Sequence, residues 1–455
     1  MTPARYPTVA TLHVSPWRWW VCGLLFMATT LNYMDRVALN QLAVRIQTAL
    51  SLDDKQYSRL ESGFSFTFAI GALLSGFVVD RVSVRWVYPF MVLGWSLAGV
   101  LTGFANGFWM LLGCRLALGL FEAGNWPCGI RTTRAILRPE ERSFGNSLFQ
   151  SGTAFGAIFT PLIVLALLRW ADPDEPLRNA VMAVAGGTYA AVTETPTDTW
   201  RFPFRVIGTF GLLWVALWFL TVPGRLLETQ PAPAHTLGAA RYRDVFRDRR
   251  FWALLAMTIA INIAWHTYRA WLPKYLQQKR GLSEEDMTSL MTGYYLTADI
   301  GSWTVGLLTL VLIRRGRSGH IARLLAFAGC AGVALTSIAV PFAPNGWQLT
   351  LVALVFAFAA LGLFPTYFAM SQDVSAAHQG KVTGTLGAAA HMFLALVVYP
   401  IQGQVINAGR LYDLGFGPIP PYDLILGVAG VFPLLALGLM LWLWPTGPDE
   451  RRASA

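Results

Sequence analysis

Long apolar segments with almost no charge are the feature that most constrains how this chain can fold. Twelve of them are separated by short polar loops, and each can cross the core of a bilayer, which takes about 20 residues in a helix. Backbone amides in lipid must be hydrogen-bonded within the segment, so we expect an all-α membrane protein with twelve transmembrane helices. The expected spans are residues 18–38, 57–79, 86–105, 108–130, 144–169, 202–222, 251–272, 289–313, 320–342, 348–371, 383–408 and 422–444.

The composition excludes most soluble classes of protein. Of the 455 residues, 55% are hydrophobic and 13% are charged, whereas a soluble domain carries about 25% charged residues. The net charge of +10 comes from short loops rather than from a basic domain, so membrane lipid is an expected partner and nucleic acid is not. The four cysteines lie in or beside apolar segments without a C-x-x-C motif, which predicts neither a disulfide framework nor a metal site.

A polar, arginine-rich tract at residues 223–250 divides the expected spans into six and six. This division predicts a first helix bundle at 1–222, a cytoplasmic linker, and a second bundle at 251–455 that ends in a short cytoplasmic tail. Lysine and arginine are concentrated in alternate loops, so the positive-inside rule predicts two cytoplasmic termini in a multi-pass protein of the cell membrane. The outside loop at 170–201 is expected to pack on the surface, and a monomer is expected.

Two expected spans carry charged residues where insertion of a charge costs about 2.5–3.5 kcal/mol. The first contains Asp35 and Arg36 side by side, and the fourth contains Arg115 and Glu122. Arg115 and Glu122 lie on one face of a helix, about 10 Å apart along its axis, because their separation is close to two helical turns. Two interpretations stay open: a static ion-pair network that fixes helix packing, or a polar cavity that binds an anion and a proton.

The residue types favour the cavity. Arginine stays charged and presents a planar fork that matches a carboxylate, whereas aspartate and glutamate change charge when they bind a proton. Buried ion pairs often do not offset their own desolvation, so stability alone is a weak explanation for these four residues. No histidine or cysteine accompanies the acids at metal-ligand spacing, and neither a metal nor another cofactor is expected.

Three stretches in these spans form recognisable motifs: Asn-Tyr-Met-Asp-Arg at 32–36, Arg-Leu-Ala-Leu-Gly-Leu-Phe-Glu-Ala-Gly-Asn-Trp-Pro at 115–127, and Phe-Gln-Ser-Gly-Thr at 149–153. Together they resemble the anion:cation symporter family of the major facilitator superfamily, and within it the hexuronate/aldonate (galactonate-like) branch. The loop at 76–85 resembles the signature that the whole superfamily carries between spans two and three. The likeness covers nearly the whole chain and implies the major facilitator fold.

The resemblance implies proton-coupled uptake of a sugar-acid anion by alternating access. It implies that Asp35 and Glu122 handle protons, that Arg36 and Arg115 serve the carboxylate substrate, and that Tyr33 lines the cavity. The resemblance also implies the substrate contacts Asn32, Gln150 and Thr153, the cavity residue Asn125, and the loop-signature residues Gly76, Asp80, Arg81 and Arg85, although Gln150 stands where asparagine is common in the family.

Weaker candidates lie elsewhere in the expected spans. Phe68 stands where many relatives carry tyrosine, so a hydroxyl that could contact a sugar is missing. Asp299 and His391 either line the cavity or form structural hydrogen bonds. Tyr268 and Arg269 either reach the cavity or its outer mouth, or, for the arginine, extend outward to the membrane surface.

Other functions are compatible with twelve spans. A drug exporter on the same fold would favour a large apolar cavity without paired arginines, and a non-transporting sensor would bind its ligand without flux. A membrane enzyme would be expected to show clustered nucleophiles or metal ligands, but H-E-x-x-H, G-x-S-x-G and P-loop motifs are absent from the sequence. We therefore expect a transporter of a small carboxylate, coupled to protons, and not an enzyme.

Overall fold

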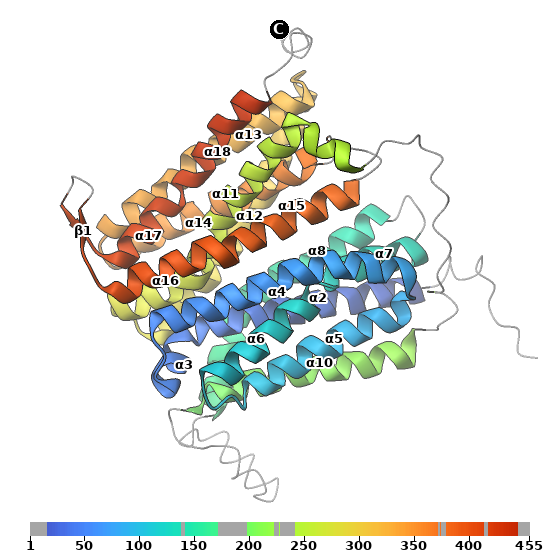
Figure 1. Cartoon of the computed structure of the whole chain (residues 1–455), viewed down its shortest axis with the longest axis horizontal. Helices are drawn as coiled ribbons and strands as arrows, with labels where there is room; N and C mark the ends of the chain where they lie inside the picture. The colour runs from blue at the N-terminus through green and yellow to red at the C-terminus, as the bar shows by residue number, and fades with distance from the viewer. Residues whose placement is uncertain are drawn as a thin grey trace, which may run out of the picture. The chain divides into compact units, whose positions relative to one another are not determined.

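Every predicted span coincides with one helix or with two or three consecutive helical elements (Figure 1). The computed structural model describes residues 16–137, 142–171, 198–222, 227, 242–371, 374, 379–413 and 417–444. The helices of the first half of the chain are α2 (Trp17–Gln41), α3 (Ala43–Leu50), α4 (Asp54–Arg81), α5 (Val84–Thr102), α6 (Phe108–Glu122), α7 (Asn125–Ile136), α8 (Arg142–Ala171) and α10 (Arg201–Thr221).

The second half is also helical. Its elements are η4 (Tyr242–Arg247), α11 (Arg249–Lys274), η5 (Tyr275–Lys279), α12 (Glu284–Arg314), α13 (Gly319–Ala334), η6 (Leu335–Phe342), α14 (Trp347–Ser371), α15 (Gln379–Phe393), η7 (Leu394–Val398), α16 (Tyr399–Ala408), α17 (Pro421–Ala429) and α18 (Val431–Leu443). Two strands of two residues each, β1 (Tyr412–Asp413) and β2 (Pro418–Ile419), pair antiparallel between α16 and α17. The all-helical expectation is therefore confirmed apart from this short pair.

Within the described ranges, nine helical stretches are long and apolar enough to cross a membrane. Of the remaining predicted spans, α6 has only 15 residues. Large apolar side chains such as Phe90, Trp303 and Leu435 are exposed on the helix surfaces, at 59%, 68% and 59%. Soluble proteins rarely expose many such groups together, so these faces suit contact with lipid. The number of spans and the direction in which they cross stay predictions.

Internal contacts divide the chain into two units that are each described separately. Unit 1 contains residues 1–39 and 70–234, and unit 2 contains residues 40–69 and 235–455. In unit 1, α5 packs against α6 and α10. In unit 2, α12 and α13 pack against α14, and α11 packs against α18, around a core that includes Phe327, Leu363 and Met440.

The boundary between the units differs from the sequence-based division at one place. Residues 40–69, which the sequence assigns to the first bundle, make their contacts with unit 2. The end of α2 and the first half of α4 therefore belong to a different unit from the rest of the same helices. The start of α11 at Arg249 also falls just inside the predicted linker, and most of that linker, like residues 172–197 of the predicted outside loop, lies outside the described residues.

A proline lies just after the interruption in two of the predicted spans. The span predicted at 108–130 breaks at Ala123 and Gly124, between α6 and α7. Pro127 has no amide hydrogen to donate to the carbonyl of Ala123, and its ring clashes with that turn of a continuous helix. The span at 383–408 similarly contains the π-helical turn η7 just before Pro400. These breaks place Glu122 and Tyr399 at helix ends.

Candidate functional site

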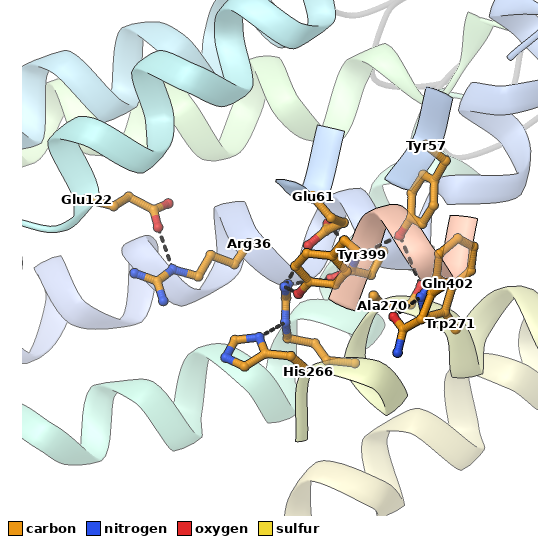
Figure 2. Close-up of polar contacts among 11 residues, drawn as sticks. Arg36, Tyr57, Glu61, Glu122, His266, Ala270, Trp271, Tyr399 and Gln402 are labelled. Carbon is orange, nitrogen blue, oxygen red and sulfur yellow. Dashed lines mark hydrogen bonds and ion pairs between the residues drawn. The ribbon is translucent and has the colours of Figure 1, made fainter. Parts of the chain in front are cut away.

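The four charged residues predicted in unit 1 are all buried. Asp35, Arg36, Arg115 and Glu122 are 3%, 8%, 1% and 0% exposed. The Nε of Arg36 on α2 donates to Oε2 of Glu122 at the end of α6, at 2.5 Å (Figure 2). The break between α6 and α7 lies directly after Glu122. The residue that accepts this bond is therefore the last residue of α6.

Asp35 is the second carboxylate of this cluster. It interacts electrostatically with both Glu122 and Arg115. Its Oδ1 is buried and has no hydrogen-bond partner among the described residues. A Cβ added at Gly99 on α5 would lie 3.0 Å from this oxygen, so only a glycine leaves this room. A buried carboxylate oxygen without a donor is chemically suited to accept a proton.

Two further predicted residues lie beside the Arg36–Glu122 pair. The guanidinium carbon of Arg36 lies 5.3 Å from the ring centroid of Tyr33, in cation–π range. Asn32 is 1% exposed, and its Nδ2 lies 3.5 Å from the carbonyl oxygen of Glu122. Gly156 on α8 brings that helix so close to α2 that a Cβ there would lie 2.7 Å from the Cβ of Tyr33. Close packing of α8 thus fixes the position of α2 beside Tyr33.

The structure does not join the other predicted contacts to this cluster. Asn125 is buried, accepts from the hydroxyl of Tyr88 at 2.7 Å and donates to Thr29 at 3.1 Å, which is a packing role between α2, α5 and α7. Gln150 is exposed, and Thr153 donates only to the carbonyl of Gln150 on its own helix. Within the described residues, neither is hydrogen-bonded to the four charges.

Side chains of the loop signature connect the beginning of α5 to the backbone after α10 by hydrogen bonds. Arg85 donates to the carbonyl of Val222, just after α10, and Ser83 donates to the carbonyl of Leu227 at 2.6 Å. Arg81 is exposed at the end of α4. Gly76 and Asp80 lie in the last part of α4, and their predicted roles stay predictions.

A second buried ion pair, which the sequence did not predict, lies in unit 2. Arg269 on α11 is 4% exposed and donates through Nη2 to Oε2 of Glu61 on α4, at 2.7 Å (Figure 2). Its other hydrogen bonds reach Asn40 at 2.7 Å, Tyr399 at 3.2 Å and His266 at 3.2 Å. Arg269 is therefore fully embedded, and of its two alternatives the outward orientation is wrong.

The weaker candidates His391, Tyr268 and Asp299 all lie in unit 2, each in a different environment. His391 lies between Phe68 and His266, with ring centroids 4.5 Å and 5.3 Å away. The ring of Tyr268 stacks at 3.8 Å on Phe356 of α14, and its buried hydroxyl has no partner among the described residues. Asp299 is half-buried on α12 and forms no hydrogen bond within the described ranges.

Glu61 is the residue that the sequence analysis missed. It lies in an apolar span and is 0% exposed, so the signal that identified Asp35 and Glu122, a charge inside a span, was also present here. Asn40 and Tyr399 could not have been found in this way, because uncharged polar residues are common in spans. Among the residues that the structure describes, each unit thus contains a buried arginine–glutamate pair.

The first pair contains the groups that an exchangeable anion site requires, a buried arginine and a buried glutamate. A guanidinium that binds an internal carboxylate can bind the carboxylate of a ligand instead once the internal one is neutralised by a proton. Arg36 has this internal partner in Glu122, and Asp35 is a second buried carboxylate in the same cluster. The described residues contain no group of three or more histidine, cysteine, aspartate or glutamate residues that could hold a metal.

Comparisons with known proteins identify a family and several relatives. Residues 25–400 match the family model of the Major Facilitator Superfamily. A galacturonate transporter of Dickeya chrysanthemi is 25% identical over 300 residues, which cover 62% of this chain and 79% of that protein. A probable sulfoacetate transporter of Cupriavidus necator is 25% identical over 452 residues, which cover 95% of this chain and 96% of that protein.

A solved structure shares the fold. It is a bacterial homologue of the human lysosomal transporter Spinster in an inward-facing and occupied conformation. The TM-score is 0.76 at 18% identity, and the alignment covers 96% of this chain and 98% of the solved one. At this identity the likeness concerns the fold alone.

Proposed function

Because the chain belongs to the major facilitator superfamily, we propose that it is a proton-coupled symporter that takes up a sugar acid or a related organic carboxylate by alternating access. It is a multi-pass protein of the inner or plasma membrane, and a transporter rather than an enzyme. The relatives named for galacturonate and sulfoacetate support an organic acid as the substrate. The proposal includes twelve spans in two six-helix bundles with cytoplasmic termini.

The buried Arg36–Glu122 ion pair beside Asp35 is the observation that carries this proposal. When Glu122 is ionised, it occupies the guanidinium of Arg36. A proton on Glu122 weakens this bond, and Arg36 then binds the substrate carboxylate through charge-assisted hydrogen bonds. Loss of the proton restores the internal pair and helps to expel the substrate. Proton and substrate bias the conformations only through these differential interactions.

Uptake into proteoliposomes under an imposed pH gradient tests the proposal. We expect the wild type to accumulate galacturonate when the lumen is alkaline, and Glu122→Gln to lose accumulation while it still exchanges substrate across the membrane. Glu285→Gln, which removes an exposed carboxylate from α12, is the matched control and should accumulate normally. Accumulation by Glu122→Gln at the rate of the wild type would refute the coupling role, and binding without any flux would identify a sensor.

A further inference from the structure

The Glu61–Arg269 pair is the centre of a continuous polar network within unit 2. Arg269 forms four hydrogen bonds, to Asn40, Glu61, Tyr399 and His266. Asn40 donates in turn to Oε1 of Glu61 at 3.0 Å and to the hydroxyl of Tyr57 at 2.8 Å. The network therefore connects the end of α2 and the start of α4 to α11 and α16 (Figure 2).

Two more ion pairs connect residues 40–69 with the rest of unit 2. Lys274 of α11 is fully buried and donates to Asp54 at the first residue of α4. Arg45 of α3 donates to both carboxylate oxygens of Glu284 of α12, at 2.8 Å and 2.6 Å. Among the described residues, three ion pairs thus attach residues 40–69 to the rest of unit 2. Contacts of this polar kind are typical of surfaces that separate and re-form, because water can hydrate both faces after separation.

The central pair has the features of a switch rather than of a stabilising contact. Glu61 is 0% exposed, and a buried ion pair adds little net stability, whereas loss of one charge leaves the other uncompensated. Glu61 is also the member that can become neutral, because arginine keeps its proton at all relevant pH values. The titratable and charged groups that face the pair or its neighbours are Tyr57 of α4, His266 of α11, Tyr295 of α12, His391 of α15 and Tyr399 of α16.

The network shares a helix with the proposed transport site. Arg36 and Asn40 lie four residues apart on α2, which is about one helical turn. Arg36 binds Glu122, and Asn40 binds Arg269 and Glu61.

We propose that Glu61 is a further proton-binding residue of the transport cycle, and that its ion pair with Arg269 is a latch that holds residues 40–69 against α11 and α16. Protonation of Glu61 removes the charge-assisted bond to Arg269 and releases these residues; loss of the proton closes the latch again. The proposal rests on the proposed function, since it assigns a conformational step of proton-coupled transport to this pair.

Thiol labelling of the purified full chain tests the latch. Ser58 is 1% exposed and packs against Gly403 of α16, so a thiol introduced by Ser58→Cys reports separation of the two elements. The four native cysteines, which are buried, are replaced by alanine. The labelling rate with a maleimide is normalised to that of Thr48→Cys, an exposed position on α3, which removes the pH dependence of the thiol itself.

We expect the normalised rate to be low at pH 8 and to rise as the pH falls. Glu61→Gln should raise the rate at pH 8 about 10- to 100-fold, the equivalent of one charge-assisted hydrogen bond, and should remove the pH dependence. Glu284→Gln is the matched control: its pair with Arg45 is partly exposed, with side chains 21% and 38% accessible, and should change the rate less than about threefold.

The double variant Glu61→Gln/Arg269→Gln covers the case in which an uncompensated Arg269 prevents folding. It removes both charges and should be labelled rapidly at every pH. The proposal is overturned if either folded variant stays as protected at pH 8 as the wild-type background. Failure of the proposed function has a different signature, since the wild type would then show no accumulation driven by a pH gradient, whatever the labelling rates are.

Discussion

Arg36 and Arg269 illustrate what an arginine requires when it is buried among apolar helices. Each is less than a tenth exposed and donates to a glutamate that is 0% exposed. The guanidinium group suits this task because its donors lie in a plane and can reach a carboxylate and other acceptors together. The Nη atoms of Arg269 do so, reaching a carboxylate, an amide and a phenol.

A double-mutant cycle on the Arg36–Glu122 pair is the first test at this scale. Arg36→Gln and Glu122→Gln should each lower the free energy of unfolding by about 3–5 kcal/mol, because each leaves a buried charge without its partner. The double variant should recover much of this loss, with a coupling energy of more than about 1 kcal/mol. The measurement is chemical or thermal unfolding in detergent. Additive effects of the two substitutions would show that the pair does not interact in solution.

A substitution at Gly99 tests the role of the surroundings of Asp35 without changing Asp35 itself. An alanine at this position brings a Cβ to 3.0 Å from Oδ1 of Asp35, so the carboxylate or α5 has to shift. Overpacking of this kind costs about 1–3 kcal/mol, and uptake driven by a pH gradient should fall. Gly113→Ala on α6 is the control, since a Cβ there meets nothing within 4 Å. Equal uptake by both variants would contradict a role for the Asp35 environment.

At the scale of elements, the start of α11 depends on one capping residue. Asp248 accepts a hydrogen bond from the backbone N–H of Arg250 at 2.8 Å and forms an ion pair with the Arg250 side chain. Partial burial raises the pKa of Asp248, but the hydrogen bonds and charge of Arg250 outweigh it and hold the pKa below its ordinary value. Asp248→Ala should lower the free energy of unfolding by about 0.5–2 kcal/mol at pH 7.

The pH dependence of this effect has a defined sign. A carboxylate whose pKa is lowered by folding stabilises the folded state above its unfolded pKa of about 3.9, and this contribution is lost as the pH falls through the lower folded value. The difference between wild type and Asp248→Ala should therefore shrink below about pH 4. Asp248→Asn keeps the cap without the charge, so it should lie between the two at pH 7. If the difference in the free energy of unfolding between wild type and Asp248→Ala did not depend on pH, the whole effect would come from the cap and none from the charge.

The helices could be predicted from the sequence because each depends on local information. A long run of apolar residues requires a helix in lipid wherever it occurs, and all twelve predicted runs are helical. The break between α6 and α7 was not predicted, although Pro127 signals it, since hydropathy continues across the break. Gly71, Gly152 and Gly156 allow close approach of neighbouring helices, because a Cβ at each would lie less than 3.0 Å from a backbone oxygen of another helix.

The candidate site was predictable only in part. Asp35, Arg36, Arg115 and Glu122 stand out because charge in a span is rare, and the structure brings them together. Hydrogen-bond and ion-pair partners that come from distant elements leave no comparable signal in the sequence. The assignment of residues 40–69 to unit 2 depends on contacts more than 200 residues apart in sequence, such as that between Glu61 and Arg269, and a period or motif in one segment carries no information about them.

At the scale of the whole molecule, proton binding and substrate binding should be linked. If a proton on Glu122 frees Arg36, then low pH favours substrate binding, and substrate binding favours proton uptake by the same factor. A ligand at 100 times its Kd adds about 2.7 kcal/mol to the free energy of unfolding. At a fixed concentration of galacturonate, the rise in Tm should therefore be larger at pH 5.5 than at pH 8.

Substitutions of Glu122 and Arg36 should change how the rise in Tm depends on pH. Glu122→Gln mimics the protonated state, so its Tm should rise on addition of galacturonate by nearly the same amount at both pH values. Arg36→Gln removes the expected receptor and should show little rise at either pH, whereas Glu285→Gln should follow the wild type. The measurement is thermal unfolding of the purified chain with and without the acid. A wild-type rise that is equal at both pH values would mean that the proton acts elsewhere in the cycle, and that Glu122 does not compete with the substrate for Arg36.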